Sequence, residues 1–254
     1  MKAYILPKMT WPEVEKALKE VKIAIVPIGA QEQHGPHIAE GCDSYRSERF
    51  SELLAERCYP QVIVTPTVTY GVSPHHMDFP GTISLRPETL MAILEDIVSS
   101  LVQHGIKKFL FINGHGGNSA TISVAANILT RKYQVEIASS DFIKAAVNTT
   151  KAEVHSEHFG HACEREVSEC LYLAPEIVRE DQLQAGNMNL DSFPMKYRKK
   201  PYINIVNQFK EITNSGNLGD GTKASYELGK KFIEEALENI SEFIMDFKDV
   251  LRNE

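Results

Sequence analysis

Short apolar runs alternate with longer helix-like stretches along this chain, and that alternation restricts the fold more than any other feature. The apolar runs lie at 22–29, 61–68, 107–112 and 135–140, and the helix-like stretches lie at 44–58, 87–104 and 118–133. Repeated β–α units of this kind form a parallel sheet with helices on its faces. We therefore predict an α/β protein, a three-layer α/β/α sandwich with a mainly parallel central sheet.

The chain is expected to form one domain over residues 1–254. Its 43% hydrophobic and 24% charged residues are typical of a globular domain with a sizeable core. A last helix is predicted from about Thr222 to Leu251, because apolar residues recur there at helical spacing. The Asn/Gly-rich stretch from Asn214 to Gly221 is expected to precede it as a loop.

Four potential metal ligands follow the first long apolar run. Glu32, His34, His37 and Asp43 lie within twelve positions of one another. Carboxylate and imidazole ligands suit Zn²⁺, Mn²⁺ or another borderline divalent ion, and an aspartate can bridge two such ions. The same residue types are common in polar surface loops, so this segment alone leaves both interpretations open.

A fifth potential ligand follows another apolar run. The run at 107–112 ends in Asn113-Gly-His115-Gly-Gly117-Asn118. Loops that leave neighbouring strands of an open α/β sheet can converge on one site, so His115 is expected to join the first group. A phosphate-binding loop is disfavoured, because this segment has neither the GxGxxG nor the GxxxxGK[ST] pattern.

The densest cluster of ionisable residues runs from His155 to Ser168. The apolar stretch from Val167 to Leu173 is predicted to be a buried helix with Glu164 and Glu166 in its first turn. Carboxylates at that position also complement a helix dipole, so a purely structural role stays open for both.

Further histidines have open roles at this point. His37 could orient a ligand or serve as an exposed cap. His75 and His76 belong either to a flap over the pocket or to an ordinary polar loop. No role is assigned to His158.

Three sequence blocks resemble the creatininase family of metal-dependent amidohydrolases. The blocks are Glu32-Gln-His34-Gly-Pro-His37 with Asp43, Asn113-Gly-His115-Gly-Gly-Asn118, and His161-Ala-Cys-Glu164-Arg-Glu166-Val-Ser168. Weaker similarity at Phe79–Leu85 and Gly219–Ala224 extends the match over most of the chain.

The resemblance implies a centre of two divalent ions, Zn or Mn, with Fe or Co accepted by the same ligands. Glu32, Asp43 and His115 would hold one ion, and His34, Asp43 and a further carboxylate would hold the other. Creatininase proper has that carboxylate where this chain has Gly117. Family members with Gly-Gly in the second block tend to carry a glutamate three residues after the histidine of the third block. Glu164 has that spacing and is the expected ligand.

By the same resemblance, His161 is expected to act as general acid, with Glu164 as a second proton relay. A metal-activated water would cleave a cyclic amide or another non-standard C–N amide bond of a small molecule. A formamidopyrimidine deformylase-like activity and a precursor-peptide peptidase are the alternatives, and a metal-containing scaffold or binding protein is the non-enzymatic one. Creatininase proper is expected to place tryptophans over its substrate, but the single tryptophan here is Trp11. Creatinine itself is therefore not the expected substrate.

Composition restricts the partners of the protein. A net charge of −7 disfavours nucleic acid, whose phosphates require clustered Lys and Arg. No apolar stretch reaches the roughly 18–20 residues of a membrane helix, and no signal-peptide core precedes the first strand. Four cysteines without a CxxC pair fit reduced thiols, so a cytoplasmic location is expected. The family resemblance implies a homo-oligomer, often a hexamer.

Overall fold

A computed structural model describes residues 2–198, 200, 202, 203 and 205–250. Within these residues, five parallel strands form one sheet in the order β1-β3-β2-β4-β5. The strands are β1 (Tyr4–Ile5), β2 (Ile23–Ile28), β3 (Val62–Val64), β4 (Lys108–Asn113) and β5 (Glu136–Asp141). The parallel sheet confirms the predicted fold class.

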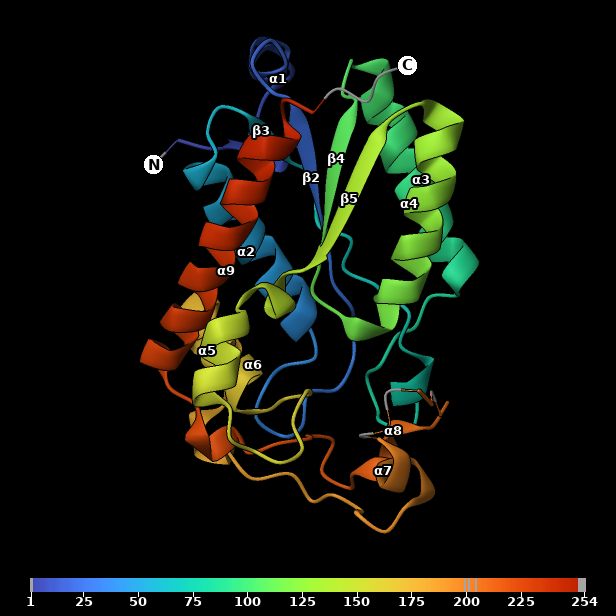
Figure 1. Cartoon of the computed structure of the whole chain (residues 1–254), viewed down its shortest axis with the longest axis vertical. Coiled ribbons are helices and arrows are strands. Elements are labelled where there is room, and N and C mark those ends of the chain that lie inside the picture. Colours follow the sequence, from blue (N-terminus) through green and yellow to red (C-terminus); the bar gives the residue numbers. More distant parts are fainter. Residues whose placement is uncertain (1, 199, 201, 204, 251–254) are drawn as a thin grey trace.

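Helices cover both faces of the sheet, as Figure 1 shows. Helices α2 (Cys42–Arg57) and α9 (Tyr226–Phe247) lie on one face, and α3 (Pro87–Gln103) and α4 (Ser119–Tyr133) lie on the other. The shorter helices are α1 (Trp11–Ala17), α5 (Val147–Glu153), α6 (Glu164–Leu173), α7 (Phe193–Tyr197) and α8 (Phe209–Ile212). None of the described helices is both long and apolar enough to cross a membrane.

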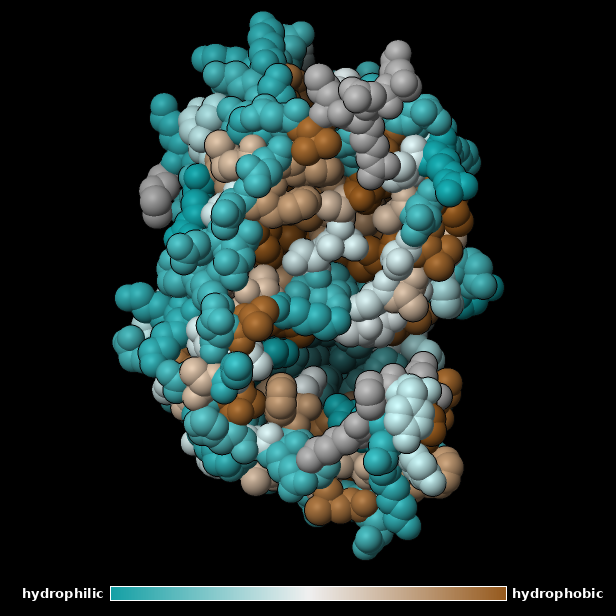
Figure 2. Space-filling view, in the orientation of Figure 1, coloured by the Kyte–Doolittle hydropathy of each residue, from teal (hydrophilic) through white to brown (hydrophobic). Residues whose placement is uncertain are grey.

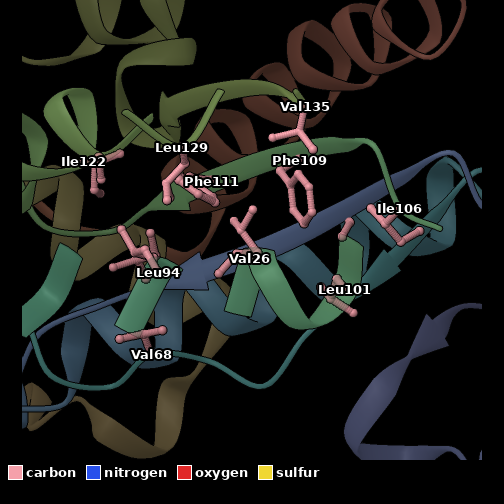
Figure 3. Close-up of a cluster of buried hydrophobic side chains, with 14 of the residues drawn as sticks. Val26, Val68, Leu94, Leu101, Ile106, Phe109, Phe111, Ile122, Leu129 and Val135 are labelled. Carbon is pink, nitrogen blue, oxygen red and sulfur yellow. The ribbon is translucent and has the colours of Figure 1, made fainter. Parts of the chain in front are cut away.

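The two faces of the sheet have separate apolar cores. Along β4, Phe109 and Phe111 pack toward α3 and α4, where Leu94 is a neighbour (Figure 3). Leu110 alternates with them and packs toward α2 and α9, where Phe232 is buried. This alternation follows from the two-residue period of a strand, and each fully buried apolar side chain stabilises the fold by roughly 1.5–3 kcal/mol.

Most of the predicted elements occur, with different bounds at some ends. The last helix is α9, which begins after Ser225, whose side chain accepts a hydrogen bond from the Leu228 backbone N–H. The predicted end at Leu251 lies outside the described residues. Strand β3 is only three residues long, ending before Pro66. The sequence patterns did not predict β1 and α1, which are too short to give a clear periodic signal.

Strands β2 and β4 leave the sheet side by side, and this places the site. Ile28 and Asn113 are register partners at the carboxyl ends of these strands, and the Gly114 N–H donates to the Ile28 carbonyl. A Cβ atom on Gly114 would lie 2.5 Å from the backbone oxygen of Asp43, so only glycine lets α2 begin against the end of β4. The shorter helices α5–α8 gather beyond this end of the sheet (Figure 1).

Candidate metal centre

Four of the predicted ligands meet at the carboxyl ends of β2 and β4. Glu32 and His34 lie on the loop after β2, Asp43 lies in the first turn of α2, and His115 directly follows the loop glycine after β4. All four are buried. Asp43 Oδ1 lies 3.2 Å from His34 Nε2, Asp43 Oδ2 lies 3.2 Å from His115 Nδ1, and Glu32 Oε2 lies 3.2 Å from His115 Nε2.

Several of these facing atoms are buried without a hydrogen bond. Among the described residues, Glu32 Oε2, His34 Nε2 and Asp43 Oδ2 have no hydrogen-bond partner. A buried polar atom left in that state costs about 1–3 kcal/mol. His34 Nδ1 donates to the Glu32 carbonyl oxygen at 3.0 Å, so Nε2, which faces Asp43, is the ring nitrogen that can bind a cation once it has lost its proton. The donor set therefore fits divalent cations held between these side chains.

Asp43 is the residue through which two ions could be shared, because its two oxygens face different histidines. The described residues form four clusters of potential metal donors. They are Glu32–His76–His161, Glu32–His75–His115, His34–His161–Glu166 and His34–Cys42–Asp43. This arrangement fits the predicted pair of ions better than a single one.

Glu164, an expected ligand, has one carboxylate oxygen, Oε1, that is buried without a hydrogen-bond partner among the described residues. Its other carboxylate oxygen accepts the Asp220 backbone N–H at 3.2 Å, and the residue belongs to none of the clusters found among the described residues. Glu166 instead lies in a cluster with His34 and His161. Residues two apart on a helix point roughly 200° apart, so Glu164 and Glu166 face different sides of α6.

A fully buried arginine, which the sequence patterns did not single out, connects this site to α6. The Arg46 guanidinium donates to Asp43 Oδ1 at 2.8 Å, Glu166 Oε1 at 2.9 Å and Glu169 Oε2 at 2.6 Å. It also donates to the Gly114 carbonyl at 3.3 Å. The i,i+3 spacing from Asp43 was the available signal, because it places both side chains on one face of α2.

Neighbouring charges keep the key carboxylates ionised. Burial alone would raise the pKa of Asp43, but His34 and His115 hold it well below its usual value. Burial likewise opposes ionisation of Glu166, whose pKa is nevertheless lowered by Arg46 and by His34. Both carboxylates are thus available as anionic ligands at neutral pH.

His161 lies at the same site as a neutral imidazole. Its Nε2 donates to the Gln33 carbonyl oxygen at 2.7 Å, which directs Nδ1 toward Glu32 Oε1, 3.8 Å away. Burial, reinforced by His34, lowers the pKa of His161 to about 4. The imidazole is therefore neutral at pH 7 and can act as an acid only after it has accepted a proton during the reaction.

The flap interpretation of His75 and His76 fits the geometry. His76 Nε2 lies 3.5 Å from Glu32 Oε1, and its ring stacks on Phe209 at a centroid distance of 4.2 Å. His75 stacks on His115 at 5.8 Å. The segment therefore forms one wall of the site.

The other two histidines with open roles lie apart from the donors. His37 Nε2 donates to the Ala162 carbonyl oxygen at 2.8 Å, so it holds the loop that carries His161. His158 faces the carboxylate of Glu157 at 4.0 Å.

A cavity of about 410 Å³ opens onto the metal donors. Its lining includes Ile143, Phe159 and Phe209 as apolar walls and Arg165 and Arg198 as cations. Figure 2 shows a hollow between the body that contains the sheet and the part that carries α7 and α8. A small molecule in this cavity would lie directly against the donor cluster.

Comparisons with known proteins agree with this geometry. The family model "Creatininase: Creatinine amidohydrolase" matches residues 7–244. A "Mycofactocin precursor peptide peptidase" of Mycobacterium ulcerans is 27% identical over 242 residues, which covers 91% of this chain and 83% of that protein. A "Creatinine amidohydrolase" of Pseudomonas putida is 26% identical over 269 residues, which covers 96% of this chain and 97% of that protein.

Solved structures share the fold over its full length. A creatininase mutant described as Zn-Zn type matches with a TM-score of 0.81 and 26% identity, which covers 98% of this chain and 100% of that chain. The sequence match, the shared fold and the donor cluster agree. This chain belongs to the creatininase family.

Proposed function

We propose that this protein is a metal-dependent amidohydrolase that cleaves a cyclic amide or another non-peptide C–N bond of a small molecule. The observation that carries the proposal is Asp43, whose two carboxylate oxygens face His34 and His115 at 3.2 Å beside a cavity. A structural metal site has no need of such a cavity, so the arrangement favours an enzyme over a scaffold or binding protein.

Six ligand positions are available for two ions. Glu32, Asp43 and His115 would hold one, and His34, Asp43 and Glu166 would hold the other, with zinc and manganese as the ions that suit these ligands best. When bound, two such cations polarise a carbonyl oxygen and lower the pKa of water. The Arg46 guanidinium fixes Asp43 and Glu166 in position through hydrogen bonds of 2.8 and 2.9 Å.

His161 supplies the proton transfer. As a neutral imidazole it accepts a proton at Nδ1, on the side that faces Glu32, and donates it to the departing nitrogen. Its Nε2–H stays hydrogen-bonded to the Gln33 carbonyl oxygen and fixes the ring orientation. Such a positioned group contributes on the order of 10²–10⁴ in rate. Phe159 and Phe209 line the cavity as apolar walls and would limit the access of bulk water to the reacting atoms.

A second candidate activity is peptide cleavage. It is favoured by the Mycobacterium ulcerans relative, whose name is that of a peptidase. A cyclic amide would give a ring-opened product, a formamide would give formate, and a peptide would give a shortened chain. Product analysis by mass spectrometry therefore separates the three activities.

The decisive test is elemental analysis of protein purified without chelator. About two equivalents of zinc or manganese per chain are expected from the two ligand sets. One equivalent would contradict the shared role of Asp43. Bound metal without hydrolysis of any amide in a broad panel would instead support the metal-containing scaffold.

Location and assembly are part of the same proposal. Four buried free cysteines support a reducing compartment, the cytoplasm. Membership of the family supports a homo-oligomer, with a hexamer as the expected state, and light scattering on the purified protein tests it. We also propose that residues 1–254 act as one domain.

A further inference from the structure

Positively charged side chains line the cavity beside the metal donors. The cationic side chains in its wall are Lys144, Arg165 and Arg198. The carboxylates in the same wall, Glu32, Asp43 and Glu166, already face the metal-donor histidines or Arg46. They do not pair with Lys144, Arg165 or Arg198; the carboxylates nearest to Lys144 and Arg165 are Asp141 and Glu169, which do not line the cavity.

Arg165 is the most buried of these cations. It lies in the first turn of α6, only 7% exposed, and its Nε has no hydrogen-bond partner among the described residues. The nearest carboxylate oxygen, Glu169 Oε1, is 3.6 Å from Nε, and the other Glu169 oxygen accepts a hydrogen bond from Arg46. A buried guanidinium with donors to spare is costly unless a ligand uses them.

Arg198 lines the same cavity from a different segment of the chain. It follows α7 directly, and its Nη2 lies 3.6 Å from the position that a Cβ atom on Gly160 would take. Loss of hydration lowers the pKa of its guanidinium, and no described carboxylate forms an ion pair with it. Lys144 is bound to Asp141 and largely exposed, so it adds positive charge at the rim.

We propose that the substrate carries a carboxylate or phosphate group, which Arg165 and Arg198 bind while the amide carbonyl lies at the metal centre. The inference rests on the proposed amidohydrolase function and adds the substrate class. An arginine guanidinium can donate two parallel hydrogen bonds to either a carboxylate or a phosphate group. The group that we expect on the substrate is therefore a compact oxyanion of one of these two kinds. The apolar surfaces of Phe159 and Phe209 would cover the part of the molecule between the anion and the amide.

The experiment compares matched ligands that differ only in this group. Calorimetry on the metal-loaded protein would use dihydroorotate against dihydrouracil for carboxylate, and N-formylethanolamine phosphate against N-formylethanolamine for phosphate. We expect one anionic member to bind roughly 10–100-fold more tightly than its neutral partner, as charge-assisted hydrogen bonds imply. Which pair shows the preference identifies the anion.

Variants assign the preference to the two arginines. Arg165→Gln and Arg198→Gln should each lose most of the preference, and Arg165→Lys should restore part of it. Arg131→Gln is the matched control, because Arg131 is exposed on α4 away from the cavity. If Arg165→Gln does not fold, Arg198→Gln at the exposed rim still tests the inference.

The outcomes separate this inference from the function on which it rests. Hydrolysis of amides with equal affinity for neutral and anionic ligands would overturn the anion site and leave the amidohydrolase. A preference that survives in both arginine variants and disappears in metal-stripped protein would assign the anion to the ions and overturn the inference. An arginine-dependent preference without any amide hydrolysis would support the anion site and contradict the proposed reaction.

Discussion

The donors that follow β2 and β4 and the carboxylates of α6 are equally buried, but they are partnered in different ways. Glu32, His34 and Asp43 each have a buried polar atom without a hydrogen bond. On α6, Glu166 and Glu169 accept hydrogen bonds from Arg46. The first group is therefore open to cations, whereas on α6 Arg46 already supplies a counter-charge to Glu169 and to the proposed ligand Glu166. Among the described residues of α6, Glu164 is the only carboxylate that keeps a buried oxygen without a hydrogen bond. Burial and residue type alone do not distinguish a ligand from a support.

The largest effect is expected at the residue that the two ions would share. Asp43→Asn removes the charge that faces His34 and His115, so both ions should be lost. Activity should fall by more than the roughly 10–100-fold that loss of an outer partner costs. Elemental analysis and kcat/KM measure these losses, and Asp96→Asn on the exposed side of α3 is the control. Retention of both ions would contradict a bridging Asp43.

The next effect separates the two glutamates of α6. Glu166→Gln should lower metal content and reduce kcat/KM by at least about 10-fold, because Glu166 lies with His34 and His161. Glu164→Gln should keep both ions, since its carboxylate binds the Asp220 backbone N–H. The two isosteric variants are matched controls for each other. The reverse result would restore Glu164 as the ligand that the sequence predicts.

A third prediction concerns stability. Arg46→Met leaves three buried carboxylates without their counter-charge and should lower the free energy of unfolding by about 3–5 kcal/mol. Urea denaturation followed by circular dichroism measures it. Arg49→Met, on the exposed side of α2, should change this free energy by no more than about 0.5 kcal/mol. Equal midpoints for both variants would mean that the network does not support the fold.

The smallest predicted effect is proton release on metal binding. Burial alone would lower the pKa of His115, but Glu32 and Asp43 raise it well above its ordinary value. The pKa of His34 is raised in the same way, because the effects of Cys42 and Asp43 outweigh that of burial. Both imidazoles are then protonated in metal-free protein at pH 7 and must lose those protons to bind ions. Metal affinity should therefore rise with pH as long as the two imidazoles are protonated in the metal-free protein, and should level off above their raised pKa values.

Calorimetric titration in buffers of different ionisation enthalpy measures this release. About two protons per chain are expected at pH 7. His161 should contribute none, because its pKa of about 4 leaves it neutral already. A binding enthalpy that does not depend on the buffer would contradict the proposed protonation of His34 and His115.

The sequence was most informative where a pattern has one structural meaning. The apolar runs that became β2 and β4 predict strands because both faces of a parallel sheet are covered, and their loops necessarily meet at one edge. Spacing could not show which of Glu164 and Glu166 points toward His34, because that depends on how α6 is rotated against α2. The burial of Arg46 depends on three segments far apart in the chain, so no local pattern contains it.

With an ion bound at the proposed site, the position of Asp43 in the first turn of α2 would link metal supply to the lifetime of the protein. The same helix buries Phe50 and Leu54 in the core, so a cation bound to Asp43 would stabilise the first turn of α2. A ligand present at about 100 times its dissociation constant stabilises the folded state by about 2.7 kcal/mol. In a metal-starved cell the unfilled protein would open more often and be degraded sooner, so its abundance would follow the availability of the ion.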